Sequence, residues 1–545
     1  MIRPSENDRR FTGPDWELPS FNFLAQAFLL TEQWWHSTTT DIHGLAHSNA
    51  AIADFALRQC LDTVASTNFV ASNPKVLRKI METGGGNFVS GLHNWIEDWQ
   101  ALLAGGRLRS DQQFAVGKDV AVTPGKVVYR NELIELIQYA PTTQTVRPEP
   151  VLIVPAWIMK YYILDLSPHN SLVRFLVEKG FTVFMVSWKN PTPDYRDLSL
   201  EDYRHLGVDA AIAAINETMP GRRIHAAGYC LGGTLLSIAA ARLGRERPDC
   251  LRSVTLLAAQ TDFTEAGELT LFINESQVAF LEDIIWRRGL LGTSQMAGAF
   301  QMLRTNDLLW SRLVRDYLIG ERAAPSDLMS WNADATRMPY RMHSDYLRRL
   351  FLNNDLAEGR YLVDGEPVTL SDLQMPMFVI GTQRDHVAPW KSTYKIHLLA
   401  NADVTYVLTS GGHNAGIVAP PGEEGHSYQV LTKKPMILMS PPTSGSSARR
   451  PMKVHGGPSG QRSWLHIPVS PSRRCRCVGY PWATHLARTS SSSETVSIRQ
   501  HWSLRKPPSC LLGRRAAFRP SPREDEQIEA DANPVASLAQ TLSEA

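Results

Sequence analysis

The chain has 545 residues, more than one compact core usually holds, so we expect two or three structural units. Its hydrophobic share of 43% and its charged share of 20% are typical of a globular protein. The net charge of +2 gives no reason to expect a nucleic-acid partner. The six cysteines show neither a disulfide framework nor metal-ligand spacing, which favours a reducing compartment and no metal site.

Signals for secretion or membrane insertion are not visible in the sequence. Residues 1–11 are polar and charged and have no apolar signal core. The longest apolar stretch, residues 151–166, is interrupted by Pro155 and Lys160 and is too short for a membrane span. We therefore expect a cytoplasmic protein whose contact with any hydrophobic phase is made at its surface.

Residues 1–120 are predicted to form an N-terminal helical region. Apolar residues recur at helical spacing over residues 21–35 and 51–64. A further helix is expected to start at Asn73 and Pro74 and to end at the three glycines at positions 84–86.

From residue 121 to residue 262, short apolar segments alternate with predicted helices. Residues 127–129 and 133–139 are expected to pair as antiparallel strands, and buried strands are expected at 151–154, 182–186, 224–227 and 254–258. Helices are expected at 172–178 and 199–216. This alternation predicts an α/β fold with a mostly parallel sheet and helices on both faces.

The rest of the chain divides into three parts. The strand pattern fades over residues 263–374, where helical segments such as 281–288 and 345–352 predict an inserted cap. Strands return at 378–380 and 404–408, so residues 375–434 are expected to complete the core begun by residues 121–262. Residues 435–545 are crowded with Ser, Pro and Arg and have no periodicity, so we expect them to lie outside the fold.

The most informative stretch surrounds Cys230, where a predicted strand ends in Gly-Tyr-Cys-Leu-Gly and an apolar helix follows at once. This is the nucleophile elbow of the α/β-hydrolase fold, with cysteine in place of serine. Glycines at 228 and 232 leave room for a sharp turn, and the helix N-terminus favours a thiolate. The N–H of Leu231 would point at a developing oxyanion. An inert buried cysteine is the competing interpretation, and the flanking glycines favour the nucleophile.

A cysteine nucleophile needs a base and an acid, which follow it in this order along the chain: nucleophile, acid, histidine. Asp385 follows the predicted strand at 378–380, and His413 follows the one at 404–408 in a glycine-bracketed loop. Both therefore lie at strand C-terminal ends, where open α/β sheets place their sites. His386 is the alternative base, but neighbouring residues at a strand end tend to point apart. His225 is expected to be structural, and Cys250 has no local base.

At these residues the sequence resembles the polyhydroxyalkanoate (PHA) synthases, most closely the one-subunit, short-monomer type. The box around Cys230, the Asp-His-Val-Ala-Pro-Trp-Lys-Ser loop at 385–392 and the Gly-His-Asn-Ala-Gly loop at 412–416 are similar to motifs of that family. So are Asp-Arg-Arg-Phe at 8–11, Tyr-Tyr-Ile-Leu-Asp at 161–165 and Trp-Asn at 331–332. The resemblance covers roughly residues 8–434.

The resemblance implies polymerisation of (R)-3-hydroxyacyl-CoA, such as 3-hydroxybutyryl-CoA, into polyester with release of CoA. It implies that Cys230 carries the growing chain as a thioester, with His413 as general base and Asp385 as its support. The second oxyanion donor would lie near Trp157 or Ile158. The family also suggests an active homodimer at the surface of PHA granules and no cofactor.

Two departures from the family pattern bear on activity. Met159 stands where the family often has Asn, beside the expected oxyanion loop. The tail lacks the acidic, Trp-rich end of the family. Back-translation of residues 435–440 and 454–460 in a shifted frame can give Asp-Asp-Pro-Tyr-Val and Ser-Trp-Trp-Pro-Glu-Trp. We hypothesise a frameshift near Lys433 or Lys434, against the alternative of a natural disordered extension. Detecting peptides with the sequence of residues 435–545 in a digest from the source cell would exclude the frameshift.

Two other functions compete with the polymerase. A thioesterase or polyester depolymerase of the same fold would use the same three residues and differ only in admitting water to the thioester. A non-catalytic granule-surface protein could use the aromatic residues at 21–35, although packing onto the core is the simpler expectation for them.

Overall fold

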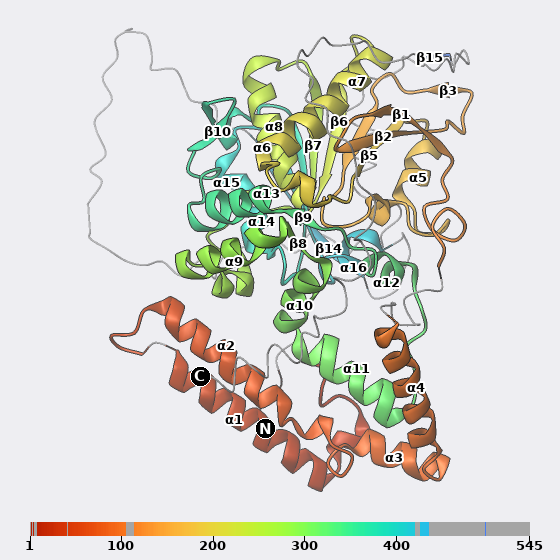
Figure 1. Ribbon diagram of the computed structural model, residues 1–545, viewed down its shortest axis with the longest axis vertical. Coiled ribbons are helices and arrows are strands. Elements are labelled where there is room, and N and C mark those ends of the chain that lie inside the picture. The colour runs from red at the N-terminus through yellow and green to blue at the C-terminus, as the bar shows by residue number, and fades with distance from the viewer. Residues whose placement is uncertain are drawn as a thin grey trace, which may run out of the picture.

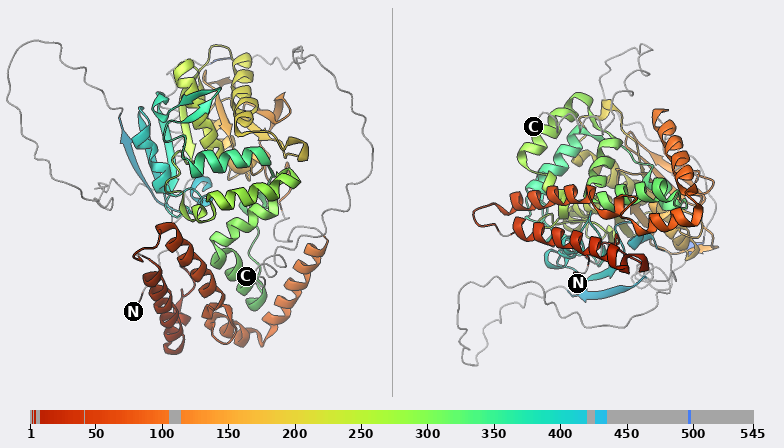
Figure 2. Two further views of the ribbon diagram at one scale, coloured as in Figure 1. Left: turned by 60° about the vertical axis from the view of Figure 1, so that its left-hand side comes forward. Right: turned by 90° about the horizontal axis from the view of Figure 1, so that it is seen from below.

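The computed structural model describes residues 2, 4, 8–40, 42–104, 114–419 and 426–434, together with the backbone of residues 496–497. Figure 1 shows an N-terminal group of helices next to a larger body in which helices surround a sheet. In the left view of Figure 2 the N-terminal helices again lie at one end of this body.

The N-terminal part is helical, as predicted. Asn73 caps the third helix by accepting hydrogen bonds from the Lys75 and Val76 amides at 3.0 and 3.3 Å. Gly84 ends that helix with a φ of 59°, in the left-handed region that favours glycine. The elements are η1 (Pro14–Glu17), α1 (Pro19–Thr39), α2 (His47–Thr63), η2 (Ser66–Asn68), α3 (Pro74–Thr83) and α4 (Gly86–Leu103).

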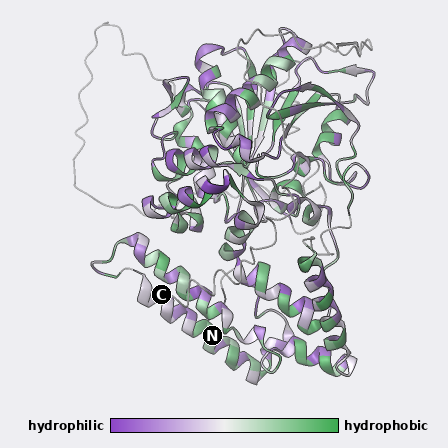
Figure 3. Ribbon diagram, in the orientation of Figure 1, coloured by the Kyte–Doolittle hydropathy of each residue, from purple (hydrophilic) through white to green (hydrophobic). Residues whose placement is uncertain are grey.

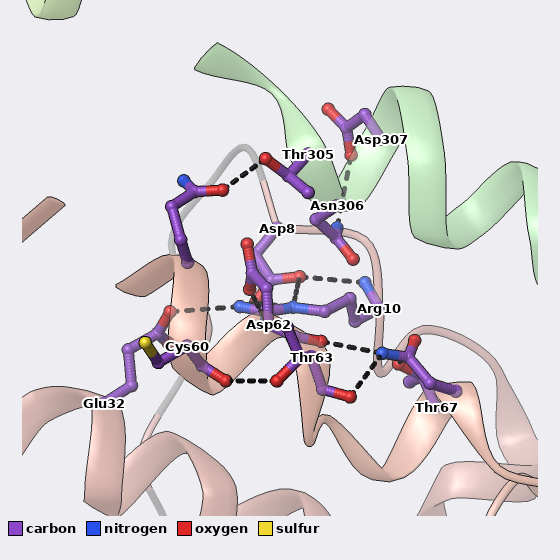
Figure 4. Close-up of polar contacts among 12 residues, drawn as sticks. Asp8, Arg10, Glu32, Cys60, Asp62, Thr63, Thr67, Thr305, Asn306 and Asp307 are labelled. Carbon is purple, nitrogen blue, oxygen red and sulfur yellow. Dashed lines mark hydrogen bonds and ion pairs between the residues drawn. The ribbon is translucent and has the colours of Figure 1, made fainter. Parts of the chain in front are cut away.

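A buried ion cluster fastens the start of the chain to α1 and α2 (Figure 4). The Arg10 guanidinium lies 2.8 Å from Asp8, 3.0 Å from Glu32 and 2.7 Å from Asp62. It also lies over the Phe28 ring, 4.6 Å from the centroid. Because removing one partner of a buried ion pair costs about 3–5 kcal/mol, the Asp-Arg-Arg-Phe motif has a structural role here.

A nine-stranded sheet runs through the larger body in the order β1-β2-β5-β4-β6-β7-β12-β13-β14. The strands from β5 to β13 in this order pair in parallel, and β1, β2 and β14 are antiparallel to their neighbours. The predicted α/β architecture is confirmed; β14, at one edge, was not predicted. The strands are β1 (Gly125–Arg130), β2 (Ile134–Tyr139), β4 (Val151–Val154), β5 (Val183–Trp188), β6 (Ile224–Tyr229), β7 (Leu251–Leu257), β12 (Met377–Thr382), β13 (Val404–Thr409) and β14 (Tyr428–Lys433).

The central strands are buried on both faces. In β4, Leu152 and Val154 belong to one hydrophobic cluster, whereas Val151 and Ile153 belong to another. This alternation places a hydrophobic core on each side of the sheet. It explains why the central strands are continuous apolar runs in the amino-acid sequence. The connecting elements are η4 (Tyr161–Leu164), α5 (Leu172–Glu178), η5 (Pro193–Tyr195), α6 (Leu200–Asp202), η6 (Tyr203–Asp209), α7 (Ala210–Thr218), α8 (Leu231–Glu246), α14 (Trp390–Tyr394), α15 (Ile396–Leu399) and α16 (Ala415–Val418).

The segment between β7 and β12 is mainly helical, as predicted, but it also contains short strands that were not. The hairpin β10 (Tyr361–Val363) and β11 (Glu366–Val368) turns at Asp364 and Gly365, both with positive φ. A second pair joins β8 (Leu290–Leu291) to β9 (Met338–Pro339). The helical elements are η7 (Gly267–Phe272), α9 (Glu275–Arg288), α10 (Thr293–Leu303), η8 (Asn306–Trp310), α11 (Ser311–Leu313), η9 (Val314–Ile319), α12 (Asp327–Asn332), α13 (Tyr340–Asp345), η10 (Tyr346–Leu352) and η11 (Leu370–Asp372).

The predicted tail, residues 435–545, lies outside the described residues except for β15 (Val496–Ser497), which pairs antiparallel with β3 (Thr145–Val146). The frameshift hypothesis therefore concerns a part of the chain that is not described. Within the described residues, none of the helices combines the length and the apolar character needed to cross a bilayer.

Candidate active site

Cys230 occupies a sharp turn between a buried strand and a buried helix. β6 ends at Tyr229 and α8 begins at Leu231. Cys230 itself has φ 51° and ψ −124°, a strained conformation for a residue with a side chain. Its N–H donates to the Leu257 carbonyl of β7 at 2.9 Å, which holds the turn in place. Cys230 is only partly buried, unlike the strand and helix residues on either side of it.

Glycines around Cys230 allow the strand and the helix to approach closely. A Cβ on Gly232 would lie 2.2 Å from the Val154 carbonyl oxygen, and one on Gly228 would lie 2.3 Å from the Gly233 Cα. Carbon atoms cannot approach other heavy atoms so closely, so a side chain at either position would push the elbow apart. The need for glycine at 228 and 232 is thus steric, as the sequence pattern indicated.

Asp385 and His413 lie in the loops that follow β12 and β13, two parallel neighbours in the sheet. The His413 Nδ1–H donates to the Asp385 carboxylate, with 2.7 Å between nitrogen and oxygen. Cys230 lies close enough to His413 to help raise the pKa of its imidazole. The Asp385 carboxylate also accepts from the Val387 and Ala388 amides, both at 2.8 Å. The structure therefore brings together Cys230, Asp385 and His413, the three residues singled out from the sequence.

Asp385 and His413 each stabilise the charged form of the other. Burial raises the pKa of Asp385, but His413 and the two loop amides outweigh it and hold the pKa below its usual range. Burial lowers the pKa of His413, but Asp385 and Cys230 raise it well above the ordinary value. An imidazole in this setting readily accepts and keeps a proton, which is the property required of a base that activates a thiol.

The alternative residues named from the sequence do not join this group. Burial and the nearby Arg304 lower the pKa of His386 to about 4, and its Nδ1 has no hydrogen-bond partner among the residues that the structure describes. Its neighbour Asp385 binds His413 instead. His225 is buried within β6, where its Nδ1 lies 2.7 Å from the Ser253 hydroxyl. Burial raises the pKa of the Cys250 thiol, which does not favour a nucleophile.

The predicted oxyanion donors lie beside the elbow. Leu231 is the first residue of α8, so its N–H has no acceptor within the helix. Trp157 and Ile158 belong to the loop after β4, whose start is in contact with Gly232. The Trp157 residue is buried in the core, with its ring 5.7 Å from the Tyr203 ring, so the ring is not available to a substrate. The assignment of these donors stays a prediction.

Four hydrogen bonds that sequence reasoning missed fix the loops of the site. Thr336 donates through its hydroxyl to the Trp157 carbonyl at 2.5 Å and through its amide to the Ile158 carbonyl at 2.8 Å. The Tyr229 hydroxyl donates to the Asn414 side chain at 2.5 Å, and Asn414 donates to Asn332 at 3.2 Å. Residues 331–336 therefore hold the loop after β4 and the histidine loop together. Only the Trp-Asn motif at 331–332 hinted at this from the sequence.

Comparison with known proteins places this arrangement in a family. The family described as Poly-beta-hydroxybutyrate polymerase (PhaC) N-terminus matches residues 7–176, and the alpha/beta hydrolase fold family matches residues 149–420. The chain is 43% identical to a poly(3-hydroxyalkanoate) polymerase of Methylorubrum extorquens, over 77% of this chain and 70% of that protein. It is 38% identical to the polymerase subunit PhaC of Rhizobium meliloti, over 77% and 70%, and 37% identical to that of Cupriavidus necator, over 77% and 72%. The predicted family and fold are thus confirmed: the chain has the α/β-hydrolase fold and belongs to the poly(3-hydroxyalkanoate) polymerases, a family of acyltransferase enzymes.

Proposed function

We propose that this protein polymerises (R)-3-hydroxyacyl-CoA, with (R)-3-hydroxybutyryl-CoA as substrate, into polyhydroxyalkanoate and releases CoA. The observation that carries the proposal is the 2.7 Å bond between His413 and Asp385, with Cys230 near enough to raise the pKa of His413, in a member of the polymerase family. Cys230 is the nucleophile, His413 the general base, and Asp385 the residue that orients and stabilises the imidazolium.

The first half of the reaction loads Cys230. His413 binds Asp385 through Nδ1, so Nε2 is the nitrogen that takes the thiol proton. The thiolate attacks the carbonyl carbon of the substrate thioester, and the C–S bond to CoA breaks as the new thioester forms. The CoA sulfur leaves with the proton held by His413. Exchange of one thioester for another is nearly balanced in energy, so the step needs positioning more than driving force.

The second half extends the polymer. The hydroxyl of a second 3-hydroxyacyl-CoA loses its proton to His413 and attacks the thioester carbonyl; the ester bond forms and the C–S bond to Cys230 breaks. The freed thiolate then attacks the CoA thioester of the lengthened chain, which returns the chain to Cys230 and releases CoA with the proton held by His413. Negative charge on the carbonyl oxygen develops in both halves. We assign its stabilisation to the Leu231 N–H and to an N–H of the loop that contains Trp157 and Ile158.

The segment at 263–374 supports transfer over hydrolysis, because it places the buried Tyr346 near the nucleophile. Burial raises the pKa of Tyr346 well above its ordinary value, and Cys230 is close enough to add to the effect. Tyr346 is buried and packs edge-on to the Trp157 ring, 6.3 Å away. A thioester held beneath this apolar cover is shielded from water, the competing acceptor. From the resemblance to the family, we also propose that the polymerase works as a homodimer at the granule surface in the cytoplasm.

The experiment follows CoA release together with turbidity after addition of (R)-3-hydroxybutyryl-CoA. We expect both signals from the wild type, neither from Cys230→Ala, and both from Cys250→Ala, which removes a thiol outside the site. CoA release without polymer would favour the thioesterase, and full activity of Cys230→Ala would overturn the proposal. Repetition with a 3-hydroxyoctanoyl substrate determines the chain-length class.

A further inference from the structure

The loop after β4 is bound by a short part of the segment between β7 and β12. Lys160 donates through its amide to the Asp334 carbonyl at 3.2 Å, and the Lys160 carbonyl accepts from the Trp331 indole N–H at 2.8 Å. The Tyr162 hydroxyl donates to the Asp334 carboxylate at 3.0 Å. We call residues 331–336 the clasp.

Thr336, the last residue of the clasp, binds two successive carbonyls of the loop. Its hydroxyl donates to the Trp157 carbonyl at 2.5 Å, and its amide donates to the Ile158 carbonyl at 2.8 Å. An antiparallel bridge between Met159 and Ala335 continues this pairing. Thr336 is fully buried. Two neighbouring peptide planes of the loop are therefore held from one side.

The surroundings of this loop are apolar, which gives the Thr336 hydroxyl its importance. Trp157, Ile158 and Leu231 belong to one hydrophobic cluster, and Figure 3 shows hydrophobic residues, in green, along strands of the sheet on which this cluster packs. A main-chain carbonyl without a donor is costly in such surroundings, because water does not replace the lost bond. Loss of the hydroxyl should therefore make the peptide plane turn or the loop shift.

The bonds to Thr336 also fix the direction of two N–H groups. In a trans peptide the N–H points away from the C=O of the same plane. Because the Trp157 and Ile158 carbonyls face Thr336, the N–H groups of Ile158 and Met159 point away from it. Neither N–H has an acceptor among the residues that the structure describes. Successive N–H groups that point the same way form a site for negative charge.

The clasp is attached to the core at both ends. Asn414, in the histidine loop, donates to the Asn332 side chain at 3.2 Å. The amide of Arg337, which follows the clasp, donates to the Asn190 side chain in the loop after β5 at 3.0 Å. Loss of one hydroxyl at Thr336 should therefore shift the loop after β4 without releasing the clasp.

We propose that Thr336 is a positioning residue for the oxyanion site, holding the loop after β4 so that the Ile158 N–H faces the carbonyl oxygen of the thioester on Cys230. The inference rests on the proposed function, which needs a second donor beside the Leu231 N–H. Thr336 does not touch the substrate and acts through the loop. Since Thr336 belongs to the segment at 263–374, the oxyanion site is complete only while this segment is seated on the core.

The test compares Thr336→Val, which removes the hydroxyl and keeps the shape, with Thr336→Ser, which keeps the hydroxyl. Thr336→Cys is a third variant, because a thiol is a weak donor. Thr39→Val is the matched control, since the buried Thr39 hydroxyl in α1 also donates to a main-chain carbonyl, that of Trp35, at 2.9 Å.

Three quantities are measured on each full-length protein. The first is kcat and KM for CoA release from (R)-3-hydroxybutyryl-CoA. The second is the affinity for a trifluoromethyl ketone analogue of the substrate, whose carbonyl becomes an oxyanion when a thiolate adds to it. The third is the rate at which iodoacetamide alkylates Cys230, followed by mass spectrometry of the Cys230 peptide. Alkylation expels iodide and forms no oxyanion, so it reports on the thiolate alone.

We expect Thr336→Val to lower kcat and ketone affinity about 10- to 100-fold, with KM within about twofold and the alkylation rate unchanged. Thr336→Ser and Thr39→Val should stay close to the wild type, and Thr336→Cys should lie between Ser and Val, which tests the proposal even if Thr336→Val does not fold.

Wild-type kcat and ketone affinity in both Thr336→Val and Thr336→Cys would overturn the proposal. So would an alkylation rate that falls as far as kcat, because that result indicates general damage to the site. A wild-type protein that releases no CoA from any hydroxyacyl-CoA would contradict the proposed function instead, and the ketone affinities would still decide the role of Thr336.

Discussion

Replacing Gly232 with alanine should damage both the fold and the reaction. The new Cβ would lie 2.2 Å from the Val154 carbonyl oxygen and 2.5 Å from that of Pro155. A carbon atom in contact with a carbonyl oxygen needs about 3.3 Å, so α8 and the end of β4 must separate by about 1 Å. Overpacking of this kind costs about 1–3 kcal/mol of unfolding free energy. A displacement of about 1 Å at a reacting group costs about 100-fold in rate.

The assay pairs urea unfolding with the initial rate of CoA release. Gly298→Ala is the matched control, because this glycine lies in helix α10 and a Cβ there meets nothing within 4 Å. The control should be neutral or more stable by up to about 1 kcal/mol, since alanine favours a helix. A Gly232→Ala protein with the stability and the rate of the wild type would refute the steric account of the elbow.

Three further changes probe single charges and hydrogen bonds, two at the site and one at His343 in helix α13. Asp385→Asn should lower the rate of CoA release about 1,000- to 10,000-fold without altering the circular dichroism spectrum, because the imidazolium loses its charged partner; a loss below tenfold would contradict the role. Asn414→Leu should cost about 1–3 kcal/mol in urea unfolding, because the buried Tyr229 hydroxyl loses its acceptor; an unchanged midpoint would count against that contact. Burial lowers the pKa of His343 to about 4, so below pH 6.5 the unfolded chain takes up a proton that the native one does not, and stability falls as the pH is lowered from 6.5 to 4. His343→Gln should flatten this slope by up to about 1.4 kcal/mol per pH unit, and an identical slope would exclude His343 as a contributor.

Much of the sheet and the elbow could be predicted because their signals are local. A strand buried on both faces is a continuous apolar run, and the Gly-x-Cys-x-Gly turn is complete within five residues. Asp385 and His413 could be placed because parallel strands end at one edge of the sheet, although they lie 28 residues apart. The hairpin at Asp364 and Gly365 had a turn signal too, but its strands of three residues are too short to show alternation.

Other features depend on contacts between distant segments. The bond between Tyr229 and Asn414 spans 185 residues, and no spacing rule anticipates it. The periodicity of α4 shows that the helix has two faces, but only the bonds of Asn87 and Asp98 to residues 317–322 show that the polar face is buried. The edge strand β14 is largely exposed and mixes polar with apolar residues, so its pattern is weak.

The central claim is that Cys230 carries the acyl group during the reaction. The most direct test is to mix the enzyme with one equivalent of (R)-3-hydroxybutyryl-CoA, quench with acid, digest, and identify the modified peptide by mass spectrometry. The account predicts a 3-hydroxybutyryl group, or a short oligomer of it, on Cys230, slower loading in Asp385→Asn and no adduct in Cys230→Ala. CoA release with an unmodified Cys230 peptide, or an adduct on another residue, would contradict it.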